Sequence, residues 1–195
     1  MPPKTTNKRY HLVDINFGYP AIFFDRDGTL VETRFFSGKP RAENNIKHVK
    51  FINDSIETVN AASGLGYRCF LVTNQPDVFD GVASKKAVEL VNDFVLKKAQ
   101  LLDIACCYER ASSKTNPDDC MKPNPKMIVD LAIKWDLDLS RSWVIGDQWK
   151  DVEAGSRAGC KTILIERFYS QTTRCDPTFV VQNIGEVIEV LRRSA

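Results

Sequence analysis

The sequence predicts an α/β fold in which helices flank a doubly wound, mainly parallel sheet. Short apolar runs rich in β-branched and aromatic residues alternate along the chain with longer amphipathic stretches at helical spacing. The short runs are apolar at both alternating positions, as in strands covered on both faces. A length of 195 residues with 43% hydrophobic content suits one domain. We expect that domain over 1–195, with its core at about 19–193 and an N-terminal extension at 1–18.

The individual elements follow from the same patterning. Strands are expected where the apolar runs are short, at 21–25, 67–73, 104–108, 142–147, 161–166 and 178–181. Helices are expected where apolar residues recur at helical spacing, at 53–66, 84–103, 124–138 and 184–193. Pro125 suits the first turn of the third helix, because that position needs no backbone N–H.

Charge and hydropathy argue against several classes of function. The chain has 27 Lys and Arg against 25 Asp and Glu, too balanced to indicate a nucleic-acid surface. The polar, basic stretch at 1–14 does not resemble a signal peptide, and no apolar run approaches about 18 residues. We therefore expect a cytoplasmic protein with no membrane partner. In that setting the six cysteines are expected as buried thiols or metal ligands rather than disulfides.

Polar side chains follow three of the predicted strands. They are Asp25 and Asp27, Thr73 and Asn74, and Asp147 with Asp151 four residues on, while Lys122 precedes a predicted helix. Because ligands gather outside the carboxyl ends of parallel strands, we expect these groups to lie close together.

Such a group of residues suits phosphate chemistry. Carboxylates from different strands repel one another unless a cation lies among them, and oxygen ligands with open positions suit Mg²⁺. Lys122 can then act as a point charge on a phosphate, and Thr73 can donate a hydrogen bond to it. Asp25 and Asp27 offer two roles: one can attack phosphorus, and the other can act as general acid and base.

Four segments, taken in order, resemble the motifs of the haloacid dehalogenase (HAD) superfamily: "DRDGTL", "VTNQ", "CMKPNP" and "GDQWKDVEAGSRAG". The resemblance runs from about residue 21 to 166. "DRDGT", "TNQ" and "KPNP" are most similar to the branch that contains D,D-heptose 1,7-bisphosphate 7-phosphatases and histidinol-phosphate phosphatases. The resemblance implies a HAD-like Rossmannoid core and a phosphatase activity.

The resemblance also implies residue roles. Asp25 would be the nucleophile and a magnesium ligand, and Asp27 would be the acid/base and bind magnesium through its backbone carbonyl. Thr73, Asn74 and Lys122 would hold the phosphoryl group. Asp147 would be a third magnesium ligand, with Asp151 as an accessory carboxylate.

The loop before Lys122 departs from that branch, which often has a zinc-binding C-x-H…C-x-C pattern there. Only Cys106, Cys107 and Cys120 remain, and the stretch holds no histidine. A closed zinc site uses four thiolate or imidazole ligands, so Glu109 or Asp118 would have to complete this one. Buried thiols are favoured over zinc.

Two cations usual in heptose-bisphosphate enzymes are also replaced. Met121 stands in place of an arginine, and Gln148 in place of a lysine. Residues 31–50 are too short for a folded cap domain, so we expect a capless, open site. The basic residues of that stretch, Arg34, Lys39, Arg41, Lys47 and Lys50, could contact a second phosphate.

The sequence thus predicts a Mg²⁺-dependent phosphomonoesterase that acts on a heptose-bisphosphate-like phosphosugar through an aspartyl-phosphate. Histidinol-phosphate phosphatase and polynucleotide 3′-phosphatase remain alternatives, as does a catalytically silent binding module with the HAD fold. The expected partner is a small phosphorylated molecule rather than nucleic acid. The chain is expected to be a monomer or a weak homo-oligomer.

Overall fold

The computed structural model describes residues 18–111, 116 and 118–194. A six-stranded sheet has the order β5-β4-β1-β6-β7-β8, and every neighbouring pair is parallel. Its strands are β1 (Ala21–Phe24), β4 (Arg68–Asn74), β5 (Asp103–Cys107), β6 (Trp143–Gly146), β7 (Lys161–Ile165) and β8 (Phe179–Val181). The α-helices are α1 (Ser55–Gly64), α2 (Lys85–Lys98), α3 (Lys126–Trp135), α4 (Trp149–Ala158) and α5 (Val187–Ser194). The predicted α/β fold with a parallel sheet is confirmed.

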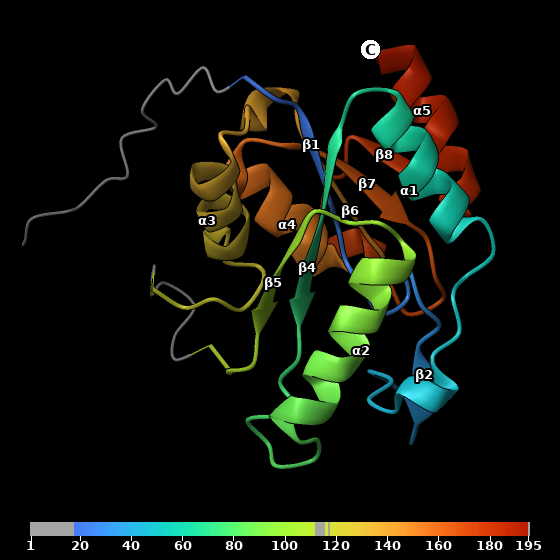
Figure 1. Ribbon diagram of the computed structural model, residues 1–195, viewed down its shortest axis with the longest axis vertical. Coiled ribbons are helices and arrows are strands. Elements are labelled where there is room, and N and C mark those ends of the chain that lie inside the picture. Colours follow the sequence, from blue (N-terminus) through green and yellow to red (C-terminus); the bar gives the residue numbers. More distant parts are fainter. Residues whose placement is uncertain (1–17, 112–115, 117, 195) are drawn as a thin grey trace, which may run out of the picture.

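Helices cover both faces of the sheet, which makes three layers (Figure 1). On β1, Ile22 and Phe24 belong to the core shared with α1, α2 and α5. Ala21 and Phe23, which point the other way, belong to the core shared with α3 and α4. All four are fully buried, and this two-sided burial is why the strand is apolar at every position.

The strand order places a topological switch point beside β1. From β1 the chain continues to β4 and β5 on one side, whereas β6, β7 and β8 build outward on the other side. The loops that leave β1 and β6 therefore diverge at the carboxyl edge of the sheet. In open α/β sheets this crevice is where ligands bind.

Several element boundaries differ from the predicted ones. The second helix was expected to reach residue 103 but ends at Lys98, because Gln100 takes a left-handed conformation (φ +53°) and residue 103 already belongs to β5. The third helix ends at Trp135 because Asp136 is also left-handed (φ +55°). Helix α4 was not predicted; it begins in a capping box formed by Gln148 and Asp151.

The stretch at 31–50 is not a cap domain but contains a small hairpin of β2 (Arg34–Phe36) and β3 (Lys39–Arg41). Ser37 and Gly38 both have positive φ, at +50° and +73°, as a two-residue primed turn requires. The ring of Phe35 packs 5.2 Å from that of Phe168, so the loop after β7 supports the hairpin. Within the described part of the chain, no helix is both long and apolar enough to span a bilayer.

Packing of α4 on the sheet requires a glycine, and this gives a stability prediction. A Cβ at Gly155 would lie 2.7 Å from Thr162 Cγ2 and 2.8 Å from Val144 Cβ. Gly155→Ala should lower the free energy of unfolding by about 1–3 kcal/mol, because overpacking outweighs the gain in helix propensity. Urea unfolding would measure this.

Gly64→Ala is the matched control, since Gly64 is also helical but has no atom within 4 Å of the added Cβ. It should leave stability unchanged or raise it. Equal effects of the two substitutions would contradict the packing argument.

Candidate active site

Three carboxylates meet at the switch point. Asp25 follows β1, Asp147 follows β6 and Asp151 lies in the first turn of α4. One oxygen from each lies within 4.8 Å of the others. The backbone N–H of Asp25 donates to Ile145 O at 2.9 Å, so the pairing of β1 with β6 extends to the residue that carries the carboxylate.

A buried lysine lies among these acids. Lys122 Nζ is 2.7 Å from Asp25 Oδ1 and 2.5 Å from Asp151 Oδ1, and it donates to Val72 O at 2.8 Å. The residue is only 4% exposed. One ammonium compensates two of the three carboxylates, so the cluster keeps an excess of negative charge.

Burial and this excess of negative charge raise the pKa values of two of the carboxylates. Burial raises the pKa of Asp25 to about 7, with repulsion from Asp151 and Asp27 adding to it and the attraction of Lys122 opposing it. Burial also raises the pKa of Asp147 well above its usual range, and Asp25 and Asp151 add repulsion there. Carboxylates held in this way favour a bound cation.

The donor set fits a magnesium ion. Asp147 Oδ1 is buried and has no hydrogen-bond partner among the described residues, which leaves one carboxylate oxygen available to bind a cation. Gly28 makes room for the other oxygen: a Cβ there would lie 2.2 Å from Asp147 Oδ2. Clustered carboxylate oxygens without nitrogen or sulfur ligands suit a hard cation such as Mg²⁺.

Asp27 lies beside this cluster but is held by different partners. Its Oδ2 accepts from Arg26 Nε at 2.9 Å and from Gln75 Nε2 at 2.8 Å. Arg26 is fully buried, and its Nη1 donates to Asn92 Oδ1 at 2.6 Å. The carboxylate of Asp27 is therefore fixed by a buried guanidinium.

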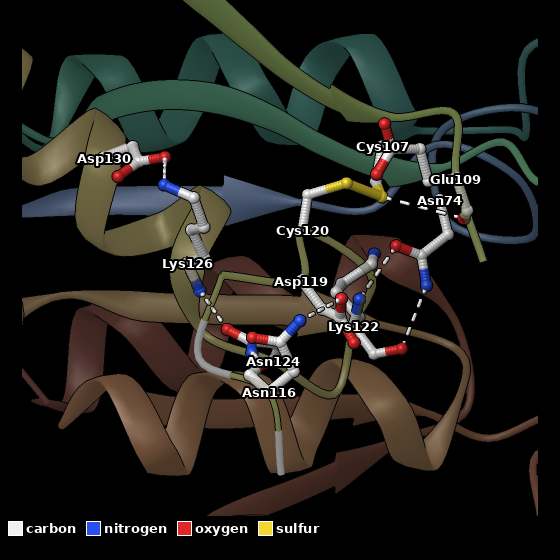
Figure 2. Close-up of a disulfide and its surroundings, with 10 residues drawn as sticks. All are labelled: Asn74, Cys107, Glu109, Asn116, Asp119, Cys120, Lys122, Asn124, Lys126 and Asp130. Carbon is white, nitrogen blue, oxygen red and sulfur yellow. Dashed lines mark hydrogen bonds and ion pairs between the residues drawn. A yellow bond between two sulfur atoms is a disulfide. The ribbon is translucent and has the colours of Figure 1, made fainter. Parts of the chain in front are cut away.

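Thr73 and Asn74 have different surroundings although they are neighbours. Thr73 Oγ1 is buried and accepts from Gln75 Nε2 at 2.9 Å, so its own O–H can donate. The amide of Asn74 accepts from Lys122 N at 3.0 Å and donates to Lys122 O at 3.2 Å (Figure 2). Asn74 thus positions the lysine loop, and its contact with a phosphate stays a prediction.

The cysteine loop corrects one expectation. Cys107 and Cys120 form a disulfide with Cα atoms 5.4 Å apart, rather than remaining thiols (Figure 2). Cys106 keeps a free thiol. Because adjacent residues of a strand face opposite sides of the sheet, Cys106 and Cys107 cannot point into one metal site. The disulfide joins the end of β5 to the loop two residues before Lys122.

The cluster opens into a cavity of about 230 Å³. Its lining includes every residue predicted for the phosphate and magnesium site: Asp25, Asp27, Thr73, Asn74, Lys122, Asp147 and Asp151. The candidate zinc ligands Cys106, Cys107 and Cys120 are not part of the lining. Arg41 and Lys150 also line it. Arg41 is paired with Asp77 at 2.8 Å, whereas Lys47 and Lys50 line a separate cavity of about 400 Å³.

Known proteins with similar sequences decide the family. The profile of the HAD-hydrolase-like family matches residues 119–187. A D-glycero-beta-D-manno-heptose-1,7-bisphosphate 7-phosphatase from Rhodopseudomonas palustris is 33% identical over 149 residues, which is 72% of this chain and 79% of the relative. A D-glycero-D-manno-heptose-1,7-bisphosphate 7-phosphatase from Chlorobaculum tepidum is 32% identical over 172 residues, 80% of this chain and 83% of the relative. The chain is a HAD-like phosphatase.

A solved structure supports the fold of this HAD-like phosphatase. The D,D-heptose 1,7-bisphosphate phosphatase from B. bronchiseptica, complexed with magnesium and phosphate, superposes with a TM-score of 0.74. The match covers 90% of this chain and 99% of that one at 20% identity. The resemblance to the HAD superfamily is confirmed, and the alternative of a catalytically silent module is set aside.

Some residues of the site were not predicted. The hydroxyl of Tyr169, in the loop after β7, lies close to Asp147: a Cβ at Gly28 would be 2.7 Å from this hydroxyl and 2.2 Å from Asp147 Oδ2. Arg26 and Gln75 lie inside recognised motifs. Their polar side chains stand directly next to predicted site residues, Arg26 between Asp25 and Asp27 and Gln75 after Asn74, and this position could have identified them. Tyr169 lies outside every motif, and nothing in the local sequence marks it.

The repulsion among the carboxylates of the phosphatase gives a prediction for the metal-free protein. The pKa of Asp25 is about 7 in the folded protein and 3.8 in an ordinary environment. Between these two pH values the folded protein therefore keeps a proton on Asp25 that the unfolded chain has lost. Stability should therefore fall as pH rises through that window. Asp25→Asn should flatten this fall, and Mg²⁺ should stabilise the wild type at pH 8 more than the variant.

Thermal unfolding in chelator and in Mg²⁺ would measure both effects. Asp93→Asn is the control, because Asp93 is exposed on α2. A wild-type pH slope retained in Asp25→Asn would refute the assignment.

Proposed function

We propose that the phosphatase hydrolyses a phosphosugar of the heptose-bisphosphate type with Mg²⁺, through an aspartyl-phosphate on Asp25. The observation that carries the proposal is the cluster of Asp25, Asp147 and Asp151 around Lys122, which lines one cavity at the switch point. The names of the two relatives described above support the choice of substrate.

The residues around the cavity divide the work of binding. Lys122 and Thr73 would hold the phosphoryl oxygens, the lysine by charge and the threonine by its free O–H. A magnesium ion held by Asp25, Asp147 and the backbone carbonyl of Asp27 would neutralise charge between the carboxylates and the phosphoryl group. Asn74 keeps Lys122 in place through its two bonds to the lysine backbone.

The chemistry would proceed in two displacements at phosphorus. A carboxylate oxygen of Asp25 attacks, the ester P–O bond breaks, and Asp27 gives its proton to the departing sugar oxygen. Asp27 then takes a proton from water, which attacks the aspartyl-phosphate and releases inorganic phosphate and Asp25. Oδ1 of Asp27 is the oxygen we assign to the proton, because its contacts are long: 3.3 Å to Arg26 Nη2 and 3.4 Å to Glu43 N.

Other expectations also stay proposals. They are a cytoplasmic location, a monomer or weak homo-oligomer, and a single domain over 1–195. Residues 1–17 of the expected extension lie outside the described part of the chain.

A phosphate-release panel tests the proposed function. Heptose 1,7-bisphosphate should give the highest kcat/KM, above histidinol phosphate and a 3′-phosphorylated oligonucleotide, and chelation should abolish turnover. Asp25→Asn should lose activity by several orders of magnitude while staying folded, because an amide cannot act as the nucleophile. Asp93→Asn should retain full activity. A higher kcat/KM for either competing substrate would reassign the substrate class, and turnover by pure Asp25→Asn would remove its proposed role.

The division of labour between the two acids gives a second prediction. Asp27→Asn should slow hydrolysis of a sugar phosphate by roughly 10²–10⁴-fold, the usual loss when general acid–base catalysis is removed. Formation of aspartyl-phosphate from an aryl phosphate should suffer far less, because a phenolate leaves without a proton. Rapid-quench measurements should show a burst followed by slow release. Equal losses in the first step for both leaving groups would show that Asp27 only organises the site.

A further inference from the structure

Lys150 occupies an unfavourable position for a lysine. It is the second residue of α4, where the positive end of the helix dipole favours acidic side chains. It is also partly buried and lines the cavity of the active site. Both features lower the stability of the unligated protein.

The charges around Lys150 add to this cost. Lys122, Arg174 and Arg110 are near enough to repel it, and Asp151 is the acid that attracts it. Asp151 is already engaged: Oδ1 pairs with Lys122 Nζ and Oδ2 accepts from Gln148 N at 3.0 Å. Across the described residues Lys150 forms no ion pair of its own, and its Nζ lies 6.0 Å from the Trp149 ring, at the outer limit of a cation–π contact.

The other cationic side chains of the cavity form ion pairs with carboxylates of the protein. Among the described lining residues the cations are Arg41, Lys122 and Lys150. Arg41 pairs with Asp77 at 2.8 Å, and Lys122 pairs with Asp25 and Asp151. Lys150 is therefore the cavity cation without a protein anion, and an anionic ligand would relieve both the repulsion and the desolvation.

We propose that Lys150 binds a second anionic group of the substrate while the scissile phosphoryl group lies at Asp25. The proposal rests on the proposed function and deepens it: it assigns to Lys150 the contact with the second anionic group, a phosphate or a carboxylate, of such a substrate. Lys150 is then a specificity-determining residue that lowers the stability of the free protein and favours doubly anionic substrates.

Lys150→Met is the test, and Lys86→Met is its matched control. Lys86 is likewise the second residue of its helix, α2, but it is exposed and does not line the cavity. Binding is measured by calorimetry in Asp25→Asn protein with Mg²⁺, so that no turnover occurs. The ligands are heptose 1,7-bisphosphate, heptose 7-phosphate and a phosphorylated sugar acid, which separate phosphate from carboxylate as the second anion.

Lys150→Met should weaken binding of the bisphosphate about tenfold or more, as expected for loss of a charge-assisted contact, and that of the monophosphate less than about twofold. If Lys150→Met weakens binding of the bisphosphate more than that of the phosphorylated sugar acid, the second anionic group is a phosphate; the opposite order identifies a carboxylate. Lys150→Met should also raise the unfolding temperature of unligated protein more than Lys86→Met does, whereas removal of a merely structural lysine would lower it.

Equal weakening of monophosphate and bisphosphate, no weakening at all, or a lower unfolding temperature would overturn the proposal. Its failure is distinct from that of the proposed function. Selective loss of bisphosphate binding without turnover of any phosphoester supports the anion subsite and removes the phosphosugar hydrolysis. Turnover of the bisphosphate with equal kcat/KM in wild type and Lys150→Met supports the phosphosugar hydrolysis and removes the anion subsite.

Discussion

The contact of one buried ammonium with two carboxylates, in a cluster of three, determines the arrangement of the site. Lys122 compensates Asp25 and Asp151 directly, while Asp147 keeps a buried oxygen without a partner. Removing one partner from such a buried set leaves an uncompensated charge, which costs about 3–5 kcal/mol. The metal-free protein therefore holds unfavourable charge at the place where a cation and a phosphoryl group are expected to bind.

The fold makes that concentration of charge possible. Asp25 and Asp147 end two adjacent strands, whose register is fixed by pairs such as Ile22 with Trp143. The apolar residues of β1 and β6 are buried on both faces, so the two strand ends cannot move apart without exposing the core. Hydrophobic burial thereby offsets the electrostatic cost of the site.

Much of this could be predicted from the sequence, for identifiable reasons. Asp25 and Asp147 lie in motifs that directly follow strands, and Lys122 lies in a motif of the loop before α3. Strands β1 and β6 could be predicted because they are apolar on both faces. The hairpin at Ser37 and Gly38 was missed because its flanking strands are only three residues long. The Cys107–Cys120 disulfide depends on which face of β5 each cysteine occupies, and the sequence alone does not specify that register. Tyr169 reaches Asp147 through tertiary packing alone.

Tyr169 lies between the hairpin and the carboxylate cluster of the capless site. Its hydroxyl and Asp147 Oδ2 both lie against Gly28, and its ring centroid lies 5.3 Å from that of Phe35 on the hairpin. The ring of Tyr169 therefore packs on the hairpin while its hydroxyl lies beside Asp147, so one side chain joins the edge of the site to its carboxylate cluster.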